Sequence, residues 1–114
     1  MSPDPVKYRE VPADKRMDAA LELCKGKKRL CPFYWIDPTD SDALKQVDAA
    51  VSKGIMGFKI ICSGFYPSDN RVLDVCERAA SLDKPVIFHS GILWDGCDSS
   101  RYNRPGEFEC LLEI

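Results

Sequence analysis

Three short apolar segments alternate with three helical patterns along this chain, and this alternation constrains the fold more than any other feature of the sequence. The apolar segments are residues 30–36, 55–62 and 86–90. Each consists mostly of apolar side chains, as in parallel strands that are buried on both faces. Short parallel strands that alternate with helices are typical of α/β proteins, where right-handed crossovers join neighbouring strands. We therefore expect an α/β fold with three parallel strands.

The helical patterns cover residues 14–25, 39–53 and 69–82 and are amphipathic. The first shows apolar side chains at i, i+3, i+4 and i+7, namely Met17, Ala20, Leu21 and Cys24. This spacing places the apolar side chains on one stripe of a helix, which packs against a core. The other two patterns have the same character, and residues 105–114 are expected to form a final helical segment.

Short polar residues and glycines mark the expected ends of the first two helices. Asp14 is expected to cap the start of the first, and Thr39 with Asp42 resembles a capping box at the start of the second. Gly26 and Gly54 follow the last turns, where a left-handed residue commonly ends a helix.

The spacing of the strand starts is that of βα units in a (β/α)8 barrel or a doubly wound sheet. A complete barrel takes about 250 residues, whereas this chain has 114. We therefore expect residues 14–114 to form a partial (β/α)8 TIM barrel, preceded by an N-terminal extension over residues 1–13. The alternative is a small open layer of three strands.

The charge balance and the hydropathy pattern exclude several classes of partner. The chain has 16 basic and 18 acidic side chains, a net charge of −2, so no long-range attraction to nucleic acid is expected. No apolar run approaches the roughly 18 residues of a membrane-spanning helix, so no membrane partner is expected. The first residues also lack the apolar segment of a secretory signal.

Six cysteines stand at positions 24, 31, 62, 76, 97 and 110, without any C-x-x-C pair or recognisable zinc framework. Cys24, Cys31, Cys62 and Cys76 fall within apolar stretches, where a free cysteine behaves as a small hydrophobic residue. This pattern predicts reduced thiols and a cytoplasmic location. An even number of cysteines in a short chain is also compatible with disulfides.

His89 is the only histidine, and it follows the apolar residues 86–88. This position is the carboxyl end of an expected parallel strand, the edge where α/β proteins bind ligands and hold catalytic groups. A histidine satisfied by hydrogen bonds at a strand end is the alternative. A long loop with several polar side chains follows it: Asp95, Asp98, Arg101, Tyr102 and Arg104.

Lys59 lies within an apolar strand, where two-residue alternation places it on one face with Gly57 and Ile61. A buried ammonium is costly unless it is paired or chemically altered. Lys59 is therefore either a cavity residue that contacts substrate, forms a Schiff base or is carbamylated, or a side chain whose stem extends to solvent. Tyr66, in the loop after this strand, is expected to line the rim of the same carboxyl edge as the loop that follows His89.

Four segments of the chain resemble the amidohydrolase-related family of metal-dependent TIM-barrel proteins, which includes hydrolases and decarboxylases. They are FYWIDP at 33–38, GIMGFKI at 54–60, GFYPSD at 64–69 and KPVIFHSG at 84–91. The last is the most specific, because the family ends its fifth strand with a similar proline, valine, histidine and glycine pattern. The resemblance begins near Arg29 and covers well under half of a family barrel.

The resemblance implies that the three strands are the third, fourth and fifth of eight. It makes His89 a ligand of a divalent metal, most commonly zinc, and places Lys59 inside the barrel, facing a small-molecule substrate. The implied reaction is attack of a metal-activated water on a carbonyl or amide carbon, assisted by a carboxylate base. Hydrolysis and decarboxylation both remain open.

The chain departs from the family pattern in its other metal ligands. The His-x-His pair of the first strand is absent, as are the later histidine and aspartate. Zinc sites of this kind need about three protein ligands, so we expect no complete catalytic set and no tightly bound metal in this chain alone. It is expected to be an inactive fragment of a hydrolase. The alternative is a non-catalytic α/β association module that self-associates through an apolar barrel-side face or exposed strand edges.

Overall fold

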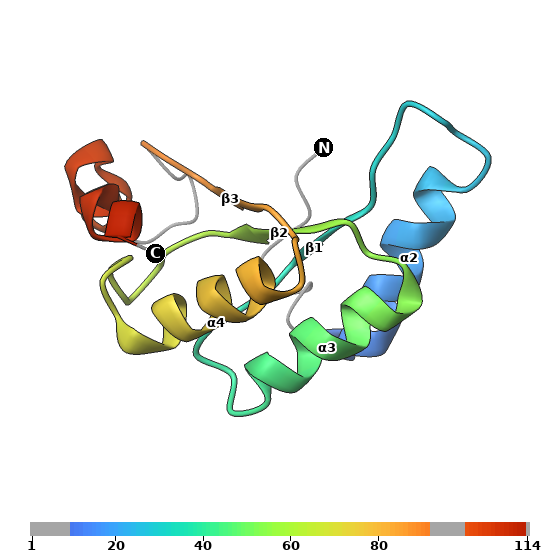
Figure 1. Ribbon diagram of the computed structural model, residues 1–114, viewed down its shortest axis with the longest axis horizontal. Helices are drawn as coiled ribbons and strands as arrows, with labels where there is room; N and C mark the ends of the chain where they lie inside the picture. The colour runs from blue at the N-terminus through green and yellow to red at the C-terminus, as the bar shows by residue number, and fades with distance from the viewer. Residues whose placement is uncertain (1–9, 92–99, 114) are drawn as a thin grey trace.

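The computed structural model describes residues 10–91 and 100–113 of the chain. Three strands form a parallel sheet in the order β1-β2-β3, and helices alternate with them along the chain (Figure 1). The elements are α2 (Ala13–Cys24), β1 (Phe33–Trp35), α3 (Ala43–Lys53), β2 (Gly57–Ile60), α4 (Asn70–Ser81), β3 (Val86–Phe88) and the 3-10 helices η1 (Ser100–Asn103) and η2 (Pro105–Glu113). The α/β expectation with three parallel strands is confirmed.

The crossover helices α3 and α4 lie side by side on the same face of the sheet (Figure 1). Helix α2 packs against α3 and against β1, so it extends this helical layer beyond the β1 edge. The phenyl ring of Phe108 in η2 lies 5.2 Å from that of Phe88, measured between centroids, so η2 contacts the other end of the sheet.

The hydrophobic core lies between the sheet and this helical layer. Alternate strand residues point into it, and they include Tyr34, Phe58 and Ile60, all essentially inaccessible to solvent. The helices contribute the side chains that the amphipathic patterns select, including Met17, Val47, Ala50, Val72, Val75 and Ala79. The apolar periodicity of the sequence therefore identifies the covered side of each helix correctly.

The remaining strand residues form the face of the sheet turned away from α3 and α4, which we call the far face. By strand alternation it consists of Phe33, Trp35, Gly57, Lys59, Ile61 and Ile87. None of their side chains belongs to the hydrophobic core of the described residues, and Ile87 is 48% exposed. The expectation that the strands are buried on both faces is thus correct only for the helical side.

The structure revises the expected helix starts. Thr39 forms no capping box; its hydroxyl and its N–H both donate to Asp37, at 2.7 and 2.9 Å. Helix α3 begins at Ala43, and the Asp42 carboxylate accepts from Gln46 Nε2 at 2.7 Å rather than capping the backbone. The buried Gln46 amide competes for that carboxylate, which explains the difference.

The other helix ends show which capping expectations the structure bears out. Asp14 lies in the first turn of α2 rather than at the cap, which is Pro12. Gly26 and Gly54 have φ angles of +72° and +107°, as expected for left-handed residues after a helix. The carboxylate of Asp69, the cap of α4, accepts from the Arg71 N–H at 2.9 Å.

Candidate functional site

The carboxyl ends of the three parallel strands meet at one edge of the sheet, and the sequence-predicted site residues follow these ends. The strand hydrogen bonding continues one residue beyond β1 and β3. Ile36 N–H donates to the Lys59 carbonyl at 3.0 Å, and His89 N–H donates to the Ile60 carbonyl at 3.1 Å. His89 is therefore held at the carboxyl edge, where the sequence places it.

Lys59 lies on β2, in register with Trp35 on one side and Ile87 on the other. Its alternation places it on the far face, and His89, two residues beyond Ile87, continues the same face of β3. Lys59 and His89 are thus diagonal neighbours on adjacent strands. Both residues are half-buried. The fold brings these two residues to the same face of the sheet.

Tyr66 lies in the loop after β2 and contacts a residue that is distant in sequence. Its ring packs edge-on against that of Tyr102 in η1, with 4.8 Å between ring centroids. The Arg101 guanidinium lies 4.7 Å from the Tyr102 ring centre and donates to the Tyr102 hydroxyl at 2.6 Å. An aromatic and cationic rim therefore stands beside the strand ends. Asp95 and Asp98 lie outside the described residues.

Asn103 connects the loops of this edge, and the sequence gives no signal for its role. Its Nδ2 donates to the Cys62 carbonyl at 2.9 Å, just beyond β2. Its own carbonyl accepts from Gly91 N–H at 3.0 Å and from Ser90 Oγ at 3.2 Å, just beyond β3. The residue is fully buried, so it ties η1 to the ends of two strands. Such a contact joins residues 41 positions apart and is invisible to local patterns.

The described residues do not fit a divalent metal site on their own. They contain no cluster of three or more His, Cys, Asp or Glu side chains that could hold an ion. Of the carboxylates after β1, Asp37 accepts from Thr39 and Asp40 accepts from Gln46, at 2.7 and 3.2 Å. His89 therefore supplies one imidazole without a ligand set around it in this part of the chain.

The cysteines show no disulfide among the described residues: Cys24, Cys31, Cys62, Cys76 and Cys110 are free. Burial raises the pKa of the Cys62 thiol to about 12 and that of Cys76 to about 11. A raised pKa disfavours the thiolate, which is the nucleophile and the metal ligand. Cys31, expected in an apolar strand, is exposed instead. Cys97 lies outside the described residues.

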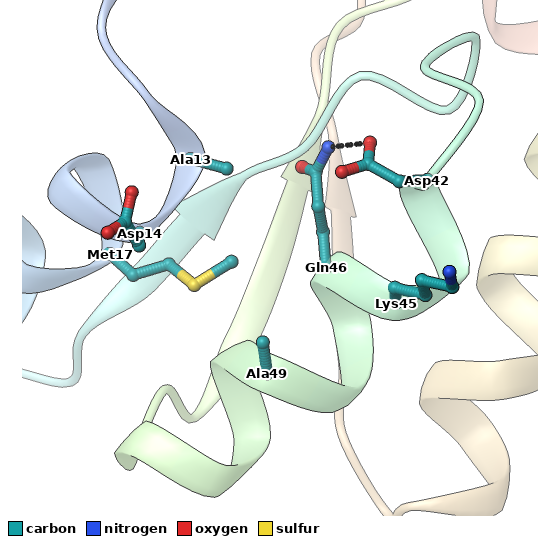
Figure 2. A pocket seen from close by; sticks show the side chains of 7 residues that line it. All are labelled: Ala13, Asp14, Met17, Asp42, Lys45, Gln46 and Ala49. Carbon is teal, nitrogen blue, oxygen red and sulfur yellow. Dashed lines mark hydrogen bonds between the residues drawn. The ribbon is translucent and has the colours of Figure 1, made fainter.

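In the helical layer, a cleft with a volume of about 360 Å³ lies between α2 and α3. Figure 2 shows Gln46 pointing into it toward Asp42, opposite Met17. The Gln46 carbonyl oxygen accepts from the Tyr34 hydroxyl at 2.7 Å, while its Nε2 donates to Asp42 and Asp40. These groups satisfy one another, so the polar wall of the cleft is explained as a hydrogen-bond network that joins Gln46 of α3 to β1 and to the loop before α3.

Comparisons with protein-family models, with curated proteins and with solved structures find no match for this chain. Within residues 10–91 and 100–113, no helix combines the length and the apolar character needed to cross a membrane.

Proposed function

We propose that this sheet is one sector of a (β/α)8 barrel in a metal-dependent hydrolase of the amidohydrolase type. In this proposal His89 is one ligand of a divalent metal, and Lys59 and Tyr66 line the substrate cavity. The observation that carries the proposal is the placement of His89 and Lys59 as diagonal neighbours on the far face, at the carboxyl edge of a parallel sheet. That edge holds the active sites of such barrels.

The strand order and the single helical layer agree with a barrel, and also with one half of a doubly wound sheet. The strands lie in sequence order β1-β2-β3, and both crossover helices lie on one face (Figure 1). A complete doubly wound sheet reverses its strand order at a switch point and carries helices on both faces, but either of its halves alone has the order and the single helical layer observed here. A barrel keeps the sequence order and places all helices outside, which leaves the other face to form the interior.

The composition of the far face also agrees with a barrel interior. Barrel interiors are filled by large side chains, which form layers drawn from alternate strands. Trp35, Lys59 and Ile87 form one row across all three strands, on the face that would become this interior. In this proposal the Lys59 side chain extends from this row to the cavity at the carboxyl edge and contacts the bound substrate.

The chain does not complete the proposed site by itself. One imidazole is too little for a catalytic zinc, which takes about three protein ligands and an open position. We therefore propose that the chain alone is inactive and retains no tightly bound metal. Hydrolysis and decarboxylation remain alternative reactions for the completed barrel, acting on a small-molecule substrate.

The test begins with the coding sequence on both sides of this segment. The proposal expects a His-x-His pair upstream and a histidine and an aspartate downstream. The longer product, once expressed, should then contain stoichiometric zinc by elemental analysis. H89N should lower this content, whereas K45Q, an exposed substitution on α3, should not. Flanking sequence without these residues, or a metal content insensitive to H89N, would refute the hydrolase proposal.

A second candidate is a non-catalytic module that associates through the far face. It is favoured by the 48% exposure of Ile87, a large apolar side chain at the centre of the edge strand β3. Analytical ultracentrifugation of the chain tests it. I87K should shift an oligomer to the monomer, whereas L44K should not, since Leu44 is similarly exposed at 45% but lies on α3. A monomer at all concentrations would exclude this candidate.

A further inference from the structure

The loop between α2 and β1 carries a dense group of positive charges. Lys25, Lys27, Lys28 and Arg29 are all exposed, and no ion pair within the described residues involves them. The loop arches beyond the end of α2 at one extremity of the molecule (Figure 1). We call residues 25–30 the basic loop. Its charges project from the body of a protein whose net charge is −2.

The basic loop has a defined backbone conformation. Lys25 N–H donates to the Glu22 carbonyl at 3.2 Å, and Lys27 N–H donates to the Cys24 carbonyl at 3.0 Å. Leu30 N–H then donates to the Lys27 carbonyl at 3.1 Å. Two successive turns therefore define the backbone from which the four cationic side chains extend.

Exposed aliphatic side chains adjoin these cations. Leu30 is 49% exposed and Met56 is 48% exposed. The Met56 N–H donates to the Pro32 carbonyl at 2.9 Å, which fixes the chain before β2 beside the end of the basic loop. Both side chains line a hollow of about 550 Å³, together with Leu21 and Pro32. Positive charge and aliphatic surface thus occur side by side.

The acidic side chains near the hollow cancel little of the positive charge of the basic loop. Asp18 and Glu22 both line it. The Asp18 carboxylate is paired with the Lys53 ammonium at 2.8 Å, so this pair adds no net charge. Glu22 therefore opposes the four cations of the basic loop as a single negative charge.

We propose that the basic loop docks the protein at the surface of an anionic lipid membrane. Lys25, Lys27, Lys28 and Arg29 lie at the headgroups, and Leu30 and Met56 enter the interfacial region. Cations and aliphatic groups contribute together at such a surface. A nucleic acid would use the cations alone, because aliphatic side chains gain nothing from a phosphate backbone and single strands are bound by stacking on aromatic rings. Docking at a surface needs no spanning helix, and it does not depend on the proposed hydrolase function.

The test is co-sedimentation of the full chain with phosphatidylcholine vesicles that contain or lack phosphatidylserine. We expect binding only to the vesicles with phosphatidylserine, and weaker binding as salt rises. Each cation near the surface strengthens binding about fivefold. The variant K27Q/K28Q/R29Q should therefore bind on the order of a hundredfold more weakly. L30S should also weaken binding while keeping its salt dependence.

A matched control removes the same number of charges elsewhere. K15Q/K45Q/R104Q changes three exposed cations outside the basic loop and should retain binding. Circular dichroism and urea unfolding of each variant report whether it keeps the fold. Equal weakening by the two triple variants, equal binding to uncharged vesicles, or competition by single-stranded DNA as strong as that by anionic vesicles would each overturn the proposal.

Discussion

Replacement of Gly57 by alanine tests whether the Phe33 ring lies across the far face. A Cβ atom at position 57 would stand 2.4 Å from Phe33 Cζ and 2.5 Å from Cε2. Carbon atoms in favourable contact are about 3.5–4.0 Å apart, so the ring must move by about 1 Å or more. Overpacking of this kind costs about 1–3 kcal/mol.

A second effect has the opposite sign and must be separated from the first. Glycine within a strand costs about 0.5–1 kcal/mol relative to alanine, because it loses more backbone entropy on folding. G57A alone should therefore lower the free energy of unfolding by up to about 2.5 kcal/mol. In an F33A background the clash is absent, so the same substitution should be neutral or stabilising by up to about 1 kcal/mol.

Urea unfolding of the four proteins in this cycle measures the coupling between Gly57 and Phe33. The backbone effect is common to both backgrounds and cancels, so the coupling energy should equal the overpacking term of about 1–3 kcal/mol. The slope m should stay constant across the set. F33L provides a milder background, because leucine lacks the ring but keeps part of the apolar side chain. An equal effect of G57A in both backgrounds would show that the ring does not lie over Gly57.

Three further predictions address other parts of the fold. Y34F removes the hydroxyl that donates to Gln46 at 2.7 Å and leaves a buried acceptor unsatisfied, so urea unfolding should show a loss of about 1–3 kcal/mol. The Arg71 side chain lowers the pKa of Asp69 to about 2 from 3.8, so Asp69 adds stability above pH 4 that is lost as the pH falls toward 2. D69N should flatten this part of the stability profile, and an unchanged profile would contradict the assignment. The Cys62 thiol, with its pKa raised by burial to about 12, should resist iodoacetamide at neutral pH until urea unfolds the protein, and rapid modification of the native protein would contradict its burial.

The parallel sheet and its helical layer follow from local patterns. The i, i+3, i+4 spacing identifies the buried side of α2, where Met17 is almost fully buried, and Gly54 ends α3 as expected. Two-residue alternation also places Lys59 on the face opposite Phe58. These features depend on neighbours within one helical turn or one strand, which is the range that a sequence pattern describes.

Contacts between distant segments could not be predicted in this way. The capping box at Thr39 fails because Asp37 and the buried Gln46 offer its residues other hydrogen bonds. Asn103 is buried because η1 returns to the end of β2, a long-range contact without any local signature. An apolar strand likewise has the same pattern whether one or both of its faces are covered, so the exposure of Ile87 was not predictable.

Local patterns predict only part of the far face, and the composition of this face distinguishes the barrel from the association module. Parallel sheets occur almost only with both faces covered, so Trp35 and Ile87 favour a further layer over this face, whether from a barrel or from a second molecule. Apolar association alone gives no reason for a lysine in the middle of the far face, because an ammonium is costly to bury between two apolar surfaces. A barrel interior open at its carboxyl edge does give a reason, since Lys59 and His89 would both reach a solvated cavity there. The polar residues of this face, rather than its apolar ones, therefore favour the barrel.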